Sequence, residues 1–313
     1  LDANGSFCGV LQPALAPAPG PAWASRLLER VCTALCRHLE PRQLGKLIEK
    51  LQVALADQDP RVGAYALEYN NPQALCFLLD AFHEALAEEV SMTIKTTSTN
   101  PDVRGGLEFW KTSFQKSYSP LVELVFGIQR KCVKCEDCGH ESISWESMNM
   151  TKVCVPRSDK PVQLLDLMKC DGEDRLEDYA CDKCAPKRSK ANVTRALWRL
   201  PNWTIIVLKR NENSGRRINT PVQIPMTCAF GPAFHPGSQE PSASDSYELF
   251  ATIHHHGSAG GGHYTSHAKH PVTGRWAHYD DESARHVDAP FLDASTYVVM
   301  YRRVAGSASS STA

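Results

Sequence analysis

The sequence predicts an α+β protein, with helices in the first third of the chain and strands in the remainder. Apolar residues recur at helical spacing as far as about residue 90. From about residue 120, short runs rich in β-branched and aromatic residues alternate with turn residues instead. Since 42% of the 313 residues are hydrophobic and 22% are charged, the chain can bury one large core or two modest ones.

Three segments show the helical pattern. It is clearest in WASRLLERVCTALCRHL (23–39) and resumes after Pro41 in RQLGKLIEKLQVAL (42–55). PQALCFLLDAFHEALAEEV (72–90) predicts a third helix, which begins with a proline, a favoured first residue. The polar stretch TTSTNPDVRGG (96–106) is predicted to be a loop.

Seven later runs predict strands: LVELVFGIQRKCV, ESISWESMNMTKVCV, NWTIIVLKR, YELFATIHHH, HYTSHAKH, RWAHYDD and TYVVMYRRV. The segment 230–246 is rich in Pro, Gly and Ser and predicts a loop. Residues 305–313 have the composition of a disordered tail.

Charge and hydropathy exclude several classes of partner. The net charge is −1, and no basic stripe surrounds the cysteine pairs, so we expect no nucleic-acid partner. No apolar run reaches the length of a membrane span and no secretory signal pattern appears, so we expect no membrane association. The chain begins at Leu1, and we expect it to be a fragment of a longer protein. The sequence does not predict the oligomeric state.

Cysteine spacing predicts a metal site. Four of the twelve cysteines form two C-x-x-C pairs, Cys135 with Cys138 and Cys181 with Cys184, the spacing of a tetrahedral zinc site. The pairs are far apart in the chain, so a folded β-ribbon must bring them together. The predicted cofactor is structural Zn²⁺, and the alternative is a ribbon that has lost its metal. Thiols used in this way favour a reducing, intracellular location, cytoplasmic or nuclear.

The densest chemical stretch is HHHGSAGGGHYTSHAKHPVTGRWAHYDDESARHV (254–287). Its glycines lead directly into His263 and permit another backbone to approach closely. Two antiparallel strands joined at residues 270–274 would place Asp280 beside His263, where a carboxylate can orient an imidazole base. The alternative is a histidine-rich surface hairpin without a catalytic role.

This stretch resembles the histidine box of the ubiquitin-specific proteases. The matching residues are Gly261, Gly262, His263, Tyr264, Trp276, Tyr279, Asp280 and Asp281. Segments 76–86, 119–142 and 203–225 are similar to other blocks of the family and occur in the family's order. The resemblance implies one catalytic domain over residues 1–304 with a papain-like cysteine protease fold. It would comprise a helical thumb (1–116), then a β-rich palm and zinc-bearing β fingers (117–304).

The resemblance also implies catalytic roles. Cys8 would be the nucleophile, His263 the general base and Asp280 the residue that orients the base. Asn4 would donate to the oxyanion, and Asp281 would help to polarise water or the oxyanion. The reaction would be hydrolysis of an isopeptide bond through an acyl-thioester intermediate.

The implied substrate is a protein conjugated to ubiquitin or to a ubiquitin-like modifier. Gly261, Gly262 and Tyr264 would flank a narrow channel that admits the modifier's C-terminal Gly-Gly. The four paired cysteines would hold structural zinc in the fingers.

Two departures from the family pattern support a second hypothesis. Around Cys8 the chain reads NGSFCGVLQ, which places Asn4 four rather than five residues before the cysteine. The prolines that follow oppose the helix that normally begins at the nucleophile. Gln73 and Cys76 replace an acidic pair that faces arginines of the ubiquitin tail, and Asp80 and Glu84 are the nearest substitutes. The alternative to an active isopeptidase is therefore a catalytically weak or silent module that binds ubiquitin or acts as a scaffold.

Overall fold

The computed structural model describes residues 79–304 except 81, 85, 170–173, 212–215, 239, 241–243, 259–260 and 282. Backbone contacts divide the chain into two compact units. The described part of the first comprises residues 79–91 and 114–122, and that of the second comprises 92–113 and 123–304. The predicted helices at 23–39 and 42–55 and the predicted tail lie outside the described residues. The boundary expected at residue 116 stays a prediction.

The first unit contains the end of the third predicted helix. Residues 79, 80, 82–84 and 86 are helical, so this helix ends about one turn earlier than the pattern in 72–90 predicts. His83 Nδ1 lies 2.8 Å from Ser119 Oγ, which ties the helix to the segment before α7 (Pro120–Val125). An antiparallel bridge between Glu88 and Tyr118 closes the unit, with N···O distances of 2.8 and 2.9 Å.

Helix α6 (Pro101–Phe114) shows that the loop predicted for residues 96–106 was wrong in its second half. Asn100 caps the helix, because its Oδ1 accepts a hydrogen bond of 2.9 Å from the backbone N–H of Asp102. Pro101 occupies the first helical position, where its missing N–H costs nothing. The polar residues that suggested a loop are therefore the start signal of a helix.

Two adjacent glycines allow α6 to lie against the strands of the second unit. A Cβ atom on Gly105 would lie 2.8 Å from Nε1 of Trp145, and one on Gly106 would lie 2.8 Å from Nε1 of Trp198. The two indole rings pack edge to face, with their centroids 4.6 Å apart. Tertiary packing thus overrides the low helix propensity of glycine.

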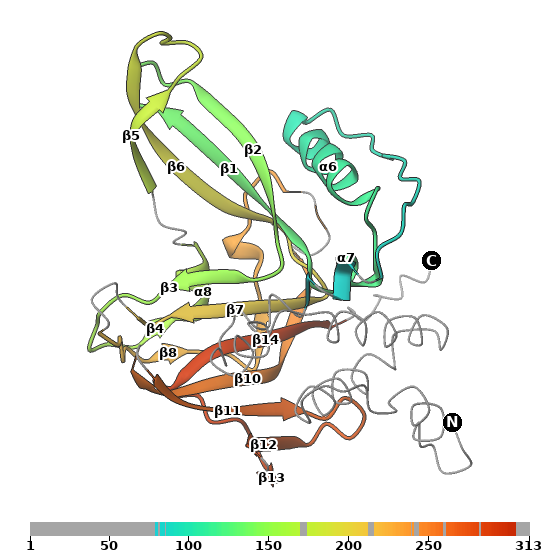
Figure 1. Cartoon of the computed structure of the whole chain (residues 1–313), viewed down its shortest axis with the longest axis vertical. Coiled ribbons are helices and arrows are strands. Elements are labelled where there is room, and N and C mark those ends of the chain that lie inside the picture. The colour runs from blue at the N-terminus through green and yellow to red at the C-terminus, as the bar shows by residue number, and fades with distance from the viewer. Residues whose placement is uncertain are drawn as a thin grey trace, which may run out of the picture. The chain divides into compact units, whose positions relative to one another are not determined.

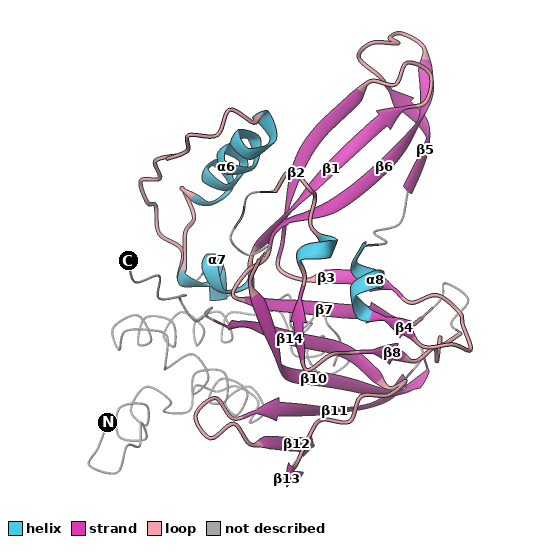
Figure 2. Ribbon diagram, turned by 180° about the vertical axis from the view of Figure 1, so that it is seen from behind, coloured by secondary structure: helices cyan, strands magenta, loops and turns pink. Residues whose placement is uncertain are grey.

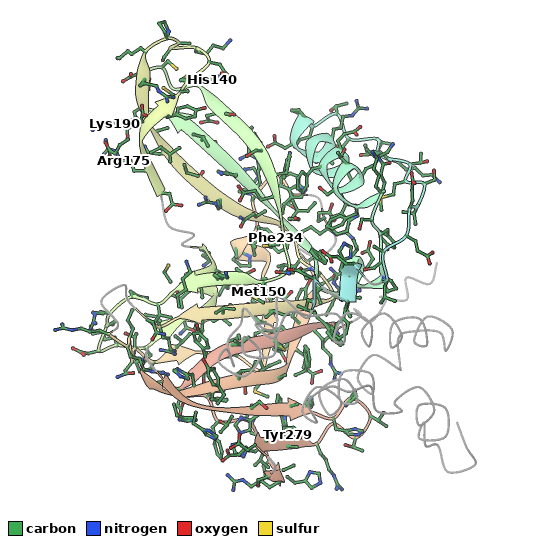
Figure 3. All side chains as sticks on the ribbon, viewed as in Figure 1. His140, Met150, Arg175, Lys190, Phe234 and Tyr279 are labelled. Atoms are coloured by element: carbon green, nitrogen blue, oxygen red, sulfur yellow. The ribbon has the colours of Figure 1, made fainter. Side chains whose placement is uncertain are left out.

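A four-stranded antiparallel sheet has the order β2-β1-β6-β5 (Figure 1). Its strands are β1 (Gly127–Cys135), β2 (Glu141–Met148), β5 (Asp174–Ala180) and β6 (Arg188–Arg199). Its apolar core is small, formed by Val133, Ala191 and Val193. Cross-strand ion pairs line the sheet, including Lys190 on β6 with Glu177 on β5 at 2.9 Å. Figure 3 labels Lys190 and Arg175 on this sheet. This sheet corresponds to the fingers that the sequence predicts.

Two strand predictions need correction. The run LVELVFGIQRKCV, which begins at Leu121, starts within helix α7, and its strand begins only at Gly127. The run 141–155 divides into β2 and β3 (Thr151–Cys154), which belong to different sheets. The predicted runs do not include β5 and β6. Strand β5 is almost entirely exposed, and the first buried positions of β6 hold the small residues Ser189 and Ala191, so neither begins with a clear apolar alternation, although β6 ends in the buried Leu197 and Trp198.

The larger sheet has eight strands, in the order β13-β12-β11-β10-β14-β7-β3 with β9 paired to β10 (Figure 2). The strands not yet bounded are β7 (Trp203–Lys209), β9 (Thr227–Ala229), β10 (Ser246–Ser258), β11 (Gly261–Lys269), β12 (Trp276–Asp280), β13 (Ser283–Val287) and β14 (Thr296–Val304). All pairs are antiparallel except β3 with β7.

The main hydrophobic core lies on this larger sheet. Phe230, Tyr247 and Tyr301 are fully buried, and both tyrosine rings lie 5.3 Å from the phenylalanine ring. Four short elements contribute further residues to this core, among them Leu164, Val222 and Ala233. They are α8 (Leu164–Lys169), η1 (Gly231–Ala233) and the parallel pair of β4 (Val162–Gln163) and β8 (Val222–Gln223). Among the described residues, no helix has the length and apolar character needed to cross a membrane.

Candidate active site and metal centre

The hairpin of β11 and β12 brings His263 and Asp280 together. His263 Nε2 lies 2.5 Å from Asp280 Oδ1, and both side chains are about half exposed, at 47% and 45%. The contact requires a proton on Nε2, which donates to the carboxylate. This hydrogen bond raises the pKa of His263 above its ordinary value, and it lowers the pKa of Asp280. The turn at residues 270–274 therefore produces the juxtaposition that the sequence predicts.

Asp281 occupies the turn that follows β12. Its φ of 46° is left-handed, a conformation that aspartate tolerates better than most residues, and the pair Asp280–Ser283 closes the turn. One carboxylate oxygen of Asp281, one of Asp280 and one ring nitrogen of His263 all lie within 4.8 Å of one another. The predicted neighbour of the orienting carboxylate thus belongs to the same cluster.

Gly257, Gly261 and Gly262, which precede His263, lie in strands. Gly257 pairs with Gly262 and His256 pairs with His263, so β11 begins at Gly261, two residues before the predicted strand run HYTSHAKH. A Cβ atom on Gly262 would lie 2.5 Å from both His255 Nε2 and His256 O. Only glycine fits there, and the predicted close approach of a second element occurs within the hairpin itself.

Several predicted site residues cannot be placed. Cys8 and Asn4 lie outside the described residues, as do Gln73 and Cys76. Asp80 and Glu84 are described and exposed in the first unit. The structure accordingly brings together three of the predicted site residues, His263, Asp280 and Asp281.

Two buried histidines on β10 and β11, the second on the strand that carries His263, were not singled out by the sequence patterns. His254 on β10 and His267 on β11 are 2% and 1% exposed, and His254 Nε2 lies 3.2 Å from His267 Nδ1. Thr252 Oγ1 lies 2.9 Å from the same His254 nitrogen. The run of three histidines was visible in the sequence, but only the structure shows that its first member is buried beside His267.

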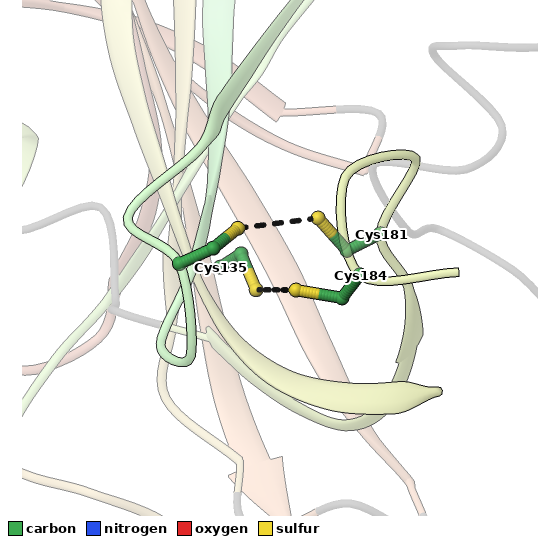
Figure 4. Close-up of side chains that lie close together, drawn as sticks. Cys135, Cys181 and Cys184 are labelled. Carbon is green, nitrogen blue, oxygen red and sulfur yellow. Dashed lines mark hydrogen bonds between the residues drawn. The ribbon is translucent and has the colours of Figure 1, made fainter. Parts of the chain in front are cut away.

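The four paired cysteines converge at one end of the smaller sheet (Figure 4). Their sulfur atoms all lie within 4.8 Å of one another. The Sγ atoms of Cys135 and Cys184 are 3.9 Å apart, and those of Cys138 and Cys181 are 3.6 Å apart. A tetrahedral ion with Zn–S bonds of about 2.3 Å requires sulfur separations of about 3.8 Å. The donor set therefore fits zinc.

Each cysteine pair is held in a tight turn. After β1, the N–H of Cys135 donates to the carbonyl of His140, and the N–H of Gly139 donates to that of Cys135, both at 2.9 Å. Gly139 has a φ of 70°, which explains why glycine follows the second cysteine. A hydrogen bond from the backbone N–H of Cys138 lowers the pKa of Cys135 to about 6. Although a backbone hydrogen bond from His140 lowers the pKa of Cys138, hydrogen bonds to the neighbouring thiols and burial raise it overall, so Cys135 loses its proton before Cys138 when no metal is bound.

Comparison with known proteins identifies what the chain resembles. The sequence model of a family described as "Ubiquitin carboxyl-terminal hydrolase" matches residues 25–301. Ubiquitin carboxyl-terminal hydrolase 5 of Saccharomyces cerevisiae is 28% identical over 262 residues, which cover 74% of this chain and 32% of that protein. Ubiquitin carboxyl-terminal hydrolase Usp2 of Drosophila melanogaster is 27% identical over 291 residues, which cover 89% of this chain and 29% of that protein. The chain thus spans about a third of the length of the curated relatives it matches.

Solved structures show the same fold. A structure of the yeast SAGA DUBm with an Sgf73 mutant superposes with a TM-score of 0.57 at 14% identity, covering 96% of this chain and 66% of that one. A structure of the SAGA Ubp8/Sgf11/Sus1/Sgf73 DUB module also gives a TM-score of 0.57, at 16% identity, covering 97% and 69%. The α+β fold predicted from the sequence is confirmed.

Proposed function

The chain belongs to the ubiquitin carboxyl-terminal hydrolase family, and on this premise we propose that it is a cysteine isopeptidase that removes ubiquitin from protein conjugates. A ubiquitin-like modifier is the alternative substrate. The observation that carries the proposal is the hydrogen bond between His263 and Asp280, two residue types in the family's order with the geometry of a base and its orienting carboxylate.

The proposed mechanism follows from which ring nitrogen is occupied. Because Nε2 of His263 donates to Asp280, Nδ1 is the nitrogen left to take the proton of the Cys8 thiol. The raised pKa of His263 favours the imidazolium and so the Cys8 thiolate. That thiolate would attack the carbonyl carbon of the C-terminal glycine and give an oxyanion, for which Asn4 is the expected donor.

The remaining steps reuse the same base. The oxyanion collapses, the C–N bond breaks, and Nδ1–H of His263 protonates the departing lysine amine. Water then gives its proton to His263 and attacks the thioester, which releases the free carboxylate and regenerates the thiol. Asp280 stays ionised throughout and holds the imidazole in one tautomer, while Asp281 would help to polarise the water or the oxyanion.

Substrate selection would depend on the narrow hairpin beside the base. Gly261 and Gly262 present backbone without side chains, so a Gly-Gly tail could lie along them, and Tyr264 would flank the tail. Asp80 and Glu84 are the carboxylates expected to face the arginines of the ubiquitin tail.

We also propose that the four-cysteine site holds structural zinc. When bound, the ion would cross-link the turn after β1 to the turn after β5, which a sheet with so small an apolar core needs. The donor set and its sulfur separations support this assignment.

An intracellular location, cytoplasmic or nuclear, remains our proposal. Each cysteine in the part of the chain that the structure describes is a free thiol, which supports a reducing compartment. We propose no nucleic-acid or membrane partner.

A silent ubiquitin-binding module is the second candidate, favoured by the altered sequence around Cys8 and by the loss of the acidic pair at residues 73 and 76. A ubiquitin probe with a C-terminal electrophile separates the two functions. An isopeptidase forms a covalent adduct that Cys8→Ala abolishes, whereas replacing Cys154, an exposed thiol on β3, leaves the adduct intact.

Turnover of a ubiquitin C-terminal amide gives the second readout. Asp280→Asn removes the charge that orients His263 and should lower kcat about 100-fold or more. Measurable ubiquitin binding without any adduct would establish the silent module instead. An adduct on Cys32 or Cys36 would show that the nucleophile is assigned wrongly.

A further inference from the structure

Arg217 joins three backbone segments behind the candidate active site. It lies between β7 and β8 and is half-buried. Its Nη1 is 3.1 Å from His255 Nδ1 and 3.3 Å from Gly257 O, both at the end of β10. Its Nη2 donates to Ala294 O, before β14, at 3.0 Å. One planar group thus connects the catalytic hairpin to two other segments of the same unit.

The contact with His255 determines the tautomer of that histidine. A guanidinium can only donate hydrogen bonds, so Nδ1 of His255 must be the acceptor and its proton must sit on Nε2. Burial, reinforced by the charge of Arg217, lowers the pKa of His255 and keeps the ring neutral. The backbone N–H of His255 donates to Ser295 O at 2.8 Å, which fixes the other end of the residue.

The His255 ring in turn supports the strand that carries the base. Its Nε2 fills the space where a side chain on Gly262 would lie, and its ring centroid is 4.5 Å from that of Tyr264. These two residues flank His263, and side chains alternate between faces along a strand. The ring therefore lies behind the backbone whose opposite face presents His263.

We infer that Arg217 is a positioning residue for the reaction: through His255 it holds residues 262–264 so that His263 keeps its productive orientation. This inference rests on the proposed isopeptidase function. Without the guanidinium, His255 can bind a proton at Nδ1 or rotate, and the end of β10 loses two hydrogen bonds. Small displacements of a catalytic group lower turnover steeply, while distant substrate contacts are unaffected.

Steady-state kinetics with a fluorogenic ubiquitin C-terminal amide test the inference. We expect Arg217→Ala to lower kcat about 10- to 100-fold while KM changes less than about 3-fold. Arg217→Lys should recover part of kcat, because an ammonium can still donate to His255 but lacks the planar fork. Arg216→Ala, at the exposed neighbouring position, is the matched control and should behave as the wild type.

A measurement independent of activity separates this inference from the proposed function. Long-range ¹⁵N NMR spectra of the wild type should show His255 as the neutral Nε2–H tautomer, and Arg217→Ala should raise its pKa. An Nδ1–H tautomer, or unchanged kcat in a folded Arg217→Ala variant, overturns the inference. A wild type without turnover but with the expected tautomer refutes the isopeptidase and leaves the Arg217–His255 contact intact. If Arg217→Ala does not fold, the kcat of Arg217→Lys and the tautomer of His255 in the wild type test the inference instead.

Discussion

Acidification is predicted to destabilise the larger sheet through His254 and His267. Burial, reinforced by neighbouring histidines and, for His267, by Arg285, lowers the pKa of each to about 4, while Asp293 opposes the shift. His267 Nε2 is buried and has no hydrogen-bond partner among the residues that the structure describes, so none of them offers an acceptor to stabilise a charged ring. Both rings therefore stay neutral in the folded protein at a pH where the unfolded chain is protonated.

Proton linkage gives both the sign and the size of the change in the free energy of unfolding with pH. A folded-state pKa below the ordinary value of 6.5 means that the unfolded state binds more protons, so stability is present above pH 6.5 and declines as the pH falls toward 4. With these pKa values, each histidine reduces the free energy of unfolding by about 2 kcal/mol between pH 7 and pH 5. The two together account for about 4 kcal/mol.

Urea unfolding of the wild type and of His267→Asn at both pH values is the assay. The asparagine amide keeps a hydrogen-bonding group near the position of Nδ1 but does not titrate. The loss of stability between pH 7 and pH 5 should be smaller in His267→Asn by about 2 kcal/mol. His286→Asn, at an exposed position on β13, should lose as much as the wild type. Equal losses in His267→Asn and the wild type would refute the reasoning.

Three further predictions concern the metal site and two glycines. Cys184→Ser should abolish zinc binding, measured by elemental mass spectrometry, and should lower Tm by about 5 °C or more. The control Cys154→Ser should keep the metal, and zinc retained in Cys184→Ser would exclude Cys184 as a ligand. Gly106→Ala should lower the free energy of unfolding, measured in urea, by about 1–2 kcal/mol. The reason is that steric overlap with the buried Trp198 outweighs a gain in helix propensity of about 1 kcal/mol. A stabilised variant would contradict the packing described for α6. Gly262→Ala should lower kcat/KM about 10-fold or more, because the new Cβ would lie 2.5 Å from backbone; wild-type turnover would show that the hairpin can relax.

The sequence by itself determined the features that depend on short stretches of chain. His263 and Asp280 meet because one hairpin with a short turn joins their strands, so alternation and turn residues were enough to predict the contact. The cysteine pairs were predictable for the same reason, because each C-x-x-C turn forms locally and the spacing of the cysteines identifies the metal donor set. The family resemblance supplied the order of the elements, and the shared fold confirms it.

Only the tertiary structure decided the features that depend on distant partners. The helix at α6 forms although it contains two glycines, because the indoles of Trp145 and Trp198 occupy the space that their missing side chains leave. The roles of Arg217 and His255 depend on residues up to 77 positions apart in sequence, which no local pattern records. Periodicity reports which face of an element is apolar, but it does not report which other element covers that face. Side-chain packing determines which elements meet, and it places Arg217 and His255 behind the strand that carries His263.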